Sequence, residues 1–252
     1  MSNEAGSSPT LTNCTFNNNS SAFNGGGMHN DSSSPTLTNC SFVGNSAAGD
    51  GGGMYNVNSS PTVAGCMLSG NSAAFGGGMH NDSGSSPNVT NCSFIGNSAA
   101  TDGGGVYNES NSSPTLTGCR FVDNTAAAFG GGFCSIGGGL STILDCEFLH
   151  NQGSQKGGGI CLDGADAVVT NCTFAGNFSD VNRGGAIDIA AANPTISNSL
   201  FVGNVAANVG GAIYAGPDAS STGSFPTISN CTLADNHANN VGGGALADLF
   251  SA

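Results

Sequence analysis

Short apolar patches alternate with polar and glycine-rich segments along the whole chain, and three of these patches recur in a fixed order. The order is Pro-Thr-Leu-Thr, Cys-Thr-Phe and Gly-Gly-Gly-Met, as at residues 9–12, 14–16 and 25–28. Each patch alternates in the manner of a β-strand, and none shows the period of a helix. The pattern therefore predicts units of three short strands joined by tight turns.

The unit recurs nine times. Its apolar anchor falls at Phe16, Phe42, Leu68, Phe94, Phe121, Phe148, Phe174, Phe201 and Leu233. Neighbouring anchors are 26 or 27 residues apart, except the last pair, which is 32 apart and indicates an insertion around residues 217–224. Such a repeat predicts an all-β fold, a right-handed parallel β-helix of about nine coils and roughly 43 Å in length. We expect residues 1–252 to form a single domain without clear end caps.

Two columns of turn residues support this prediction. Leu11 and Cys14 can both face the core only if the chain bends at Asn13, a position occupied throughout by Asn, Gly or Asp, which tolerate a left-handed backbone. Three residues after each anchor the chain always has asparagine, and stacked asparagines can hydrogen-bond from coil to coil. This predicted ladder comprises Asn19, Asn45, Asn71, Asn97, Asn124, Asn151, Asn177, Asn204 and Asn236.

The pairing of an F-x-x-N motif with G-G-A-I resembles the repeats of chlamydial polymorphic membrane proteins. Residues 16–19 and 201–204 carry the first motif, and residues 184–187 and 210–213 carry the second. The unit is also similar to β-helix repeat regions of the pectate-lyase-like superfamily. The resemblance covers nearly the whole chain, and it implies display at the cell surface or outside the cell, and adhesion.

The net charge of the chain limits which macromolecules it can bind. Three Lys and Arg against sixteen Asp and Glu give a net charge of −13, which argues against binding nucleic acid. No apolar run approaches the roughly 18 residues of a membrane-spanning helix, so we expect no membrane insertion. The opening residues have no signal-peptide pattern.

Eight of the ten cysteines form one column that should face the core as small buried side chains. A linear stack gives no tetrahedral site, so we expect no zinc. Cys134 and Cys161 instead follow inward residues and should face outward on adjacent coils. They are the candidate pair for a surface disulfide.

The same outward position carries His29, Tyr55, His80 and Tyr107 in earlier coils. We interpret it as a solvent-facing strip, which either binds sugar or protein or only packs across strands. We expect no cofactor, although calcium bound through the turn acids is an alternative. These acids are Asp31, Asp82, Glu109 and Asp163.

The pectate-lyase-like superfamily suggests a carbohydrate lyase or hydrolase as one alternative function. Lys156 and Arg183 are 27 residues apart at one coil position, and Asp163 and Asp188 lie close by in sequence. These four residues are the catalytic candidates, and a salt-bridged loop cluster is the competing interpretation.

Outward Thr-x-Thr pairs, such as those at residues 36–38 and 115–117, resemble those of ice-binding β-solenoids and give a second alternative. The row is interrupted by Ala64, Asn88, Leu144 and Val168.

The sequence favours a non-catalytic scaffold, either an adhesin-like stalk or a fibre subunit that stacks end to end. Its expected partners are further copies of itself and host or matrix glycans or proteins.

Overall fold

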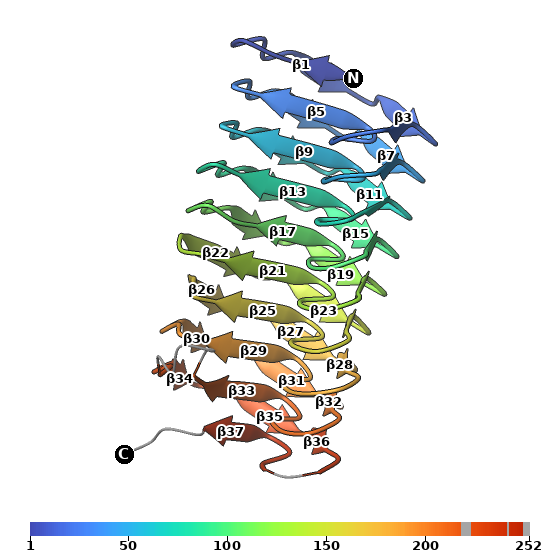
Figure 1. The fold of residues 1–252 in the computed structure, drawn as a ribbon. Coiled ribbons are helices and arrows are strands. Elements are labelled where there is room, and N and C mark those ends of the chain that lie inside the picture. Colours follow the sequence, from blue (N-terminus) through green and yellow to red (C-terminus); the bar gives the residue numbers. More distant parts are fainter. Residues whose placement is uncertain (218–222, 241, 249–252) are drawn as a thin grey trace.

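The chain winds into coils that stack along one axis, and each coil adds one strand to each of four parallel sheets (Figure 1). This computed structural model describes residues 1–217, 223–240 and 242–248. The first strand, β1 (Ser2–Asn3), and the last described strand, β37 (Leu246–Asp248), lie at opposite ends of the stack. Within the part of the chain that the structure describes, no helix is long and apolar enough to cross a membrane. The protein is therefore an all-β parallel solenoid, as predicted.

Sheet A has ten strands and contains the Gly-Gly-Gly-Met patches. Its strands are β1 (Ser2–Asn3), β5 (Met28–Asp31), β9 (Met54–Val57), β13 (Met79–Asp82), β17 (Val106–Asn108), β21 (Phe133–Ile136), β25 (Ile160–Asp163), β29 (Ile187–Ala190), β33 (Ile213–Gly216) and β37 (Leu246–Asp248).

Sheet B has nine strands and contains the Thr-Leu-Thr patches. Its strands are β2 (Thr10–Thr12), β6 (Thr36–Thr38), β10 (Thr62–Ala64), β14 (Asn88–Thr90), β18 (Thr115–Thr117), β22 (Leu140–Leu144), β26 (Asp166–Thr170), β30 (Thr195–Ser197) and β34 (Thr227–Ser229).

Sheet C has nine strands and contains the anchors. Its strands are β3 (Thr15–Asn17), β7 (Ser41–Val43), β11 (Met67–Ser69), β15 (Ser93–Ile95), β19 (Arg120–Val122), β23 (Glu147–Leu149), β27 (Thr173–Ala175), β31 (Leu200–Val202) and β35 (Thr232–Ala234).

Sheet D corrects the prediction of three strands per coil, because each coil contains a fourth strand of two residues. The strands are β4 (Ser20–Ser21), β8 (Ser46–Ala47), β12 (Ser72–Ala73), β16 (Ser98–Ala99), β20 (Thr125–Ala126), β24 (Gln152–Gly153), β28 (Phe178–Ser179), β32 (Val205–Ala206) and β36 (His237–Ala238). A two-residue strand with one small inward side chain, such as Ala99, is too short to show an alternating pattern.

Equivalent residues of successive coils pair in register, so identical side chains stack. Phe94 pairs with Phe121, and Phe121 pairs with Phe148. Their rings are fully buried and stacked, with centroids 4.7 and 4.6 Å apart. The core is consequently a row of similar layers, each packed only against its neighbours.

The bend between sheets B and C has the predicted left-handed backbone. Asn13 has a φ of 54°, and Gly65 has a φ of 61°. Asp145 adopts the same conformation with a φ of 54°. This bend lets Leu37 and Cys40 of one coil both reach the core.

The asparagines after the anchors form a continuous ladder. Asn124 donates from Nδ2 to Asn151 Oδ1 at 2.9 Å and to Phe94 O at 2.9 Å. Its own Oδ1 accepts from the backbone and side-chain nitrogens of Asn97 at 3.0 and 2.9 Å. The ladder thus satisfies buried backbone groups at the turn between sheets C and D.

The column of eight cysteines faces the core, and all eight thiols are free. Cys92 shows the usual pattern, because its Sγ donates to Thr90 O at 3.3 Å and to Val63 O at 3.4 Å. The thiols act here as small buried side chains that also hydrogen-bond to the backbone. Residues 218–222, most of the predicted insertion, lie outside the described residues.

Candidate functional site

The outer face of sheet A carries most of the side chains that the sequence singled out, arranged in three columns. The central column comprises His29, Tyr55, His80, Tyr107, Cys134, Cys161, Asp188 and Tyr214. The turn before each strand supplies the turn-side column, which comprises Asn24, Asp50, Phe75, Asp102, Phe129, Lys156, Arg183 and Val209. The loop-side column lies two residues after the central column on each strand. It comprises Asp31, Val57, Asp82, Glu109, Ile136, Asp163 and Ala190.

A glycine turn in each coil brings the turn-side column over the central one. Gly25 has a φ of 67°, and a Cβ atom there would lie 2.6 Å from Met28 O and 2.8 Å from His29 Cβ. Only glycine allows the chain to fold back this closely. The residue before the glycine is thereby placed beside the central side chain of its own coil.

The predicted solvent-facing strip is wrong in one respect, because the flanking columns cover it. Tyr55, His80 and Tyr107 are 7%, 1% and 5% exposed, and His29 alone is partly exposed. The sequence showed which way these side chains point. It did not show that the turn before the strand folds over them.

His80 lies at the centre of a buried polar and aromatic network. Its Nε2 lies 3.1 Å from Glu109 Oε1, and its Nδ1 lies 3.8 Å from Asp50 Oδ2. Its ring meets the rings of Tyr55 and Tyr107 edge-on, with centroids 5.2 and 4.9 Å apart. Burial raises the pKa of both tyrosines above their usual range.

Cys134 and Cys161 are register partners on β21 and β25, but they are not surface cysteines. Both are fully buried and free, in a small apolar cluster with Tyr107, Phe75 and Phe129. Burial is the largest influence on Cys134 and raises the pKa of its thiol; the pKa of Cys161 is also raised. Both thiols are free and lie in this buried cluster, so the prediction of a surface disulfide is wrong.

The four catalytic candidates do lie together, but as two ion pairs. Lys156 Nζ donates to Asp163 Oδ2 at 2.9 Å, and Arg183 Nε donates to Asp188 Oδ2 at 2.9 Å. Lys156 and Arg183 are neighbours through a parallel bridge, as their spacing predicted. Arg183 also donates to Tyr214 OH at 3.0 Å and lies over its ring.

Two carboxyl groups of this face have a pKa raised to about 6 or 7. Burial raises the pKa of Asp188 to about 7, although Arg183 and Lys156 act in the opposite direction. Its Oδ1 has no hydrogen-bond partner. Burial likewise raises the pKa of Asp102 to about 6, although a hydrogen bond from Phe129 N at 2.9 Å acts to lower it. A carboxyl group that titrates near neutrality can transfer protons, but Asp188 is fully buried beneath its neighbours.

Sequence reasoning missed Asp102 and a second asparagine ladder. Asp102 holds the same position as Lys156 and Arg183, immediately before the glycines, and that shared position was the available signal. The second ladder runs through Asn3, Asn30, Asn56, Asn81 and Asn108 by side-chain hydrogen bonds of 2.7 to 2.8 Å.

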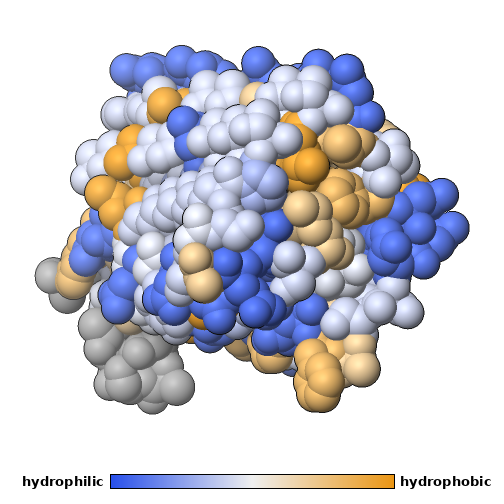
Figure 2. All heavy atoms as spheres, turned by 90° about the horizontal axis from the view of Figure 1, so that it is seen from above, coloured by the Kyte–Doolittle hydropathy of each residue, from blue (hydrophilic) through white to orange (hydrophobic). Residues whose placement is uncertain are grey.

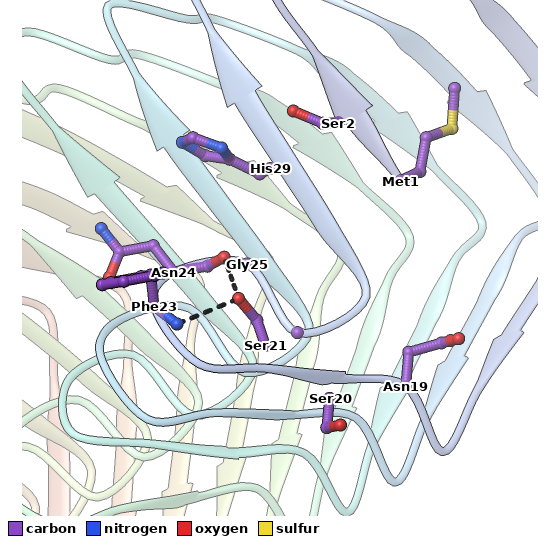
Figure 3. A pocket seen from close by; sticks show the side chains of 10 residues that line it. Met1, Ser2, Asn19, Ser20, Ser21, Phe23, Asn24, Gly25 and His29 are labelled. Carbon is purple, nitrogen blue, oxygen red and sulfur yellow. Dashed lines mark hydrogen bonds between the residues drawn. The ribbon is translucent and has the colours of Figure 1, made fainter.

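A cavity of about 560 Å³ lies at the N-terminal end of this face, where His29 and β4 meet β1 (Figure 3). Ser21 Oγ accepts from Phe23 N and donates to Asn24 O at its edge. Phe23 is 81% exposed beside it. The lining mixes polar side chains with those of Met1 and Phe23, and its titratable side chain is that of His29.

Among residues 1–217, 223–240 and 242–248, no group of three or more His, Cys, Asp or Glu side chains could hold a metal ion. Of the acids suggested for calcium, Asp163 is paired with Lys156, Asp82 accepts from Tyr55 OH at 3.3 Å, and Glu109 contacts His80. Calcium at these acids stays a prediction.

Comparison with known proteins identifies the class. A family model described as a right-handed β-helix region matches residues 1–121 and 99–233. The chain therefore belongs to the right-handed β-helix family. No curated protein matches the chain. The family includes enzymes and non-enzymatic scaffolds, so membership establishes the fold and not the activity.

Proposed function

We propose that the chain is a non-catalytic scaffold displayed at the cell surface or outside the cell, where it acts as an adhesin-like stalk. The observation that carries the proposal is the uniform coil-to-coil contact. The same asparagine ladder and the same in-register strands bind each described coil to the next. Such a structure gains length with each coil, and each coil is stabilised by contacts with its neighbours.

The state of the charged residues supports a role without catalysis. Both cations of the candidate catalytic cluster are paired with carboxylates, and Arg120 Nε pairs with Glu147 Oε2 at 2.7 Å on sheet C. These three residues are all the Lys and Arg of the chain. A polyuronate substrate would consequently meet a net charge of −13 with no free cation to receive it.

The likeness to chlamydial surface repeats favours adhesion, with host or matrix glycans or proteins as partners. Self-assembly into a fibre is a stronger form of the same proposal. Figure 2 shows the N-terminal end of the stack, where hydrophilic and hydrophobic residues are mixed. Sheet A has ten described strands and the other sheets have nine. A second copy could therefore continue all four sheets only if β1 of one copy or β37 of the other were displaced from the edge of sheet A.

Negative-stain electron microscopy with size-exclusion mass tests both forms of the proposal. Rods with an axial repeat near one chain length support the fibre. Discrete rods roughly 43 Å long support the stalk alone. Turnover of a polysaccharide by the purified chain would contradict both.

A carbohydrate-active enzyme is the second candidate, and one observation favours it. The buried Asp188, with a pKa raised to about 7, lies beside Arg183 and Tyr214, and perturbed acids of this kind cluster at functional sites. A panel of polysaccharides assayed with the full chain and with Asp188→Asn tests it. Activity that the substitution abolishes without loss of folding would favour the enzyme.

A further inference from the structure

Sheet B presents two columns of outward side chains to solvent, which together we call the threonine face. The first column comprises Thr10, Thr36, Thr62, Asn88, Thr115, Thr142, Val168, Thr195 and Thr227. The second comprises Thr12, Thr38, Ala64, Thr90, Thr117, Leu144, Thr170, Ser197 and Ser229. Twelve of these 18 positions are threonine, and none is charged.

Register makes this array more regular than the sequence alone indicates. Ala64 and Leu144 interrupt only the second column, because Thr62 and Thr142 still occupy the first column of the same coils. Thr90 likewise keeps the second column intact beside Asn88. Every described coil therefore presents at least one threonine, and the threonines point outward, exposed or half-buried.

The preference of exposed strands for threonine does not explain this face, because sheet C provides an internal comparison. Sheet C also has nine strands with two outward positions each. Only Thr15, Thr173 and Thr232 of those 18 positions are threonine. The remaining positions include Arg120 and Glu147. Strand propensity acts equally on both sheets, so the concentration of threonine on sheet B has another cause.

The threonine face is a two-dimensional lattice of hydroxyl and methyl groups. Its repeat is about 4.8 Å from coil to coil and about 6.6 Å from one column to the other. Each hydroxyl can donate one hydrogen bond and accept two. Among the described residues, the threonine hydroxyls of this face bond to side chains at two places, Thr170 with Ser197 and Thr90 with Asn88. The other hydroxyls are available to water.

We propose that the threonine face binds ice. The oxygen rows on the prism faces of ice have a short repeat that is close to the coil-to-coil spacing of the lattice. Hydroxyl groups held on rigid strands fix water at these spacings, and the methyl groups between them leave that water few other arrangements. The entropy cost of ordering the interfacial water is thereby small when ice forms against it. This activity goes beyond the proposed stalk function, which rests on the contacts between coils and not on this face.

Thermal hysteresis and ice-affinity capture of the full chain test the proposal directly. The informative variant is Thr36→Tyr with Thr117→Tyr, which raises bulky rings above the lattice in two coils. The matched control is Ser41→Tyr with Ser93→Tyr, which makes the same change at outward positions of sheet C. Thermal melting followed by circular dichroism shows whether each variant folds.

The full chain should depress the freezing point below the melting point and enter growing ice. The sheet B variant should lose most of this activity, and the sheet C variant should retain it. No hysteresis in the unmodified chain overturns the proposal, whatever the variants do. Equal loss in both folded variants also overturns it. Capture by an insoluble polysaccharide without any effect on ice overturns it too and assigns the face to a glycan.

Discussion

Replacing Asn124 by alanine tests the ladder on which the proposed stalk depends. The side chain is fully buried and makes four hydrogen bonds, two donated and two accepted. At about 1 kcal/mol of net stability per bond, the loss is about 4 kcal/mol. The backbone amide of Asn97 and the carbonyl of Phe94 would also lose these buried partners, which adds to the cost. Domains of ordinary stability have about 5–15 kcal/mol in total, so a large share would be lost.

Urea denaturation followed by circular dichroism measures the loss, and native-state hydrogen exchange shows whether the affected coils open separately from the rest. Asn124→Leu keeps the number and branching of the side-chain heavy atoms and removes the polar atoms, so it should be nearly as destabilising. Asn88→Ala is the control, because that side chain is exposed on sheet B. If Asn124→Ala costs no more than the roughly 0.5 kcal/mol typical of surface changes, the ladder is not what holds the coils together.

Three further predictions follow from packing, backbone contact and acidity. Phe121→Ala removes the middle of a ring stack and should cost about 3–5 kcal/mol by urea denaturation, whereas Phe23→Ala, at an exposed ring, should cost little. Gly104→Ala should lower the melting temperature more than Gly96→Ala, because an added Cβ at Gly104 meets the backbone carbonyl oxygens of Thr125 and Gly131, whereas one at Gly96 meets no atom within 4 Å and costs only the strain of an alanine at a φ of 60°. Because the pKa of Asp188 rises from 3.8 to about 7 on folding, the native state holds this proton more tightly than the unfolded state. The stability that this group contributes is therefore present below pH 4 and is lost as the pH rises to about 7, by up to about 4 kcal/mol. Asp188→Asn should flatten that part of the stability profile, and an unchanged profile would exclude Asp188 as its source.

The fold could be predicted because its determinants are local and repeated. The bend at Asn13 follows from two inward residues spaced three apart, and the structure has a positive φ there in each coil. The ladder through Asn124 follows from a position that never varies. Each repeat tests the same inference again, so nine coils give a far stronger signal than one.

The covered face of sheet A could not be predicted in the same way. Which residues lie over His80 or Cys134 depends on how sharply the glycine turns fold back, and no periodicity in the sequence encodes that distance. The perturbed acidity of Asp188 depends on the same cover. The short strands of sheet D, such as β16, were missed because two residues carry no alternation.

Small-angle X-ray scattering on a lengthened chain tests whether the coils are interchangeable spacers of a stalk. The variant would carry three extra copies of residues 62–87, one coil of 26 residues beginning at β10. If the coils are interchangeable, the maximum dimension should be about 14 Å longer than that of the unmodified chain, with the same cross-section, since each coil adds about 4.8 Å. A larger cross-section at unchanged length, or loss of the folded state, would contradict it.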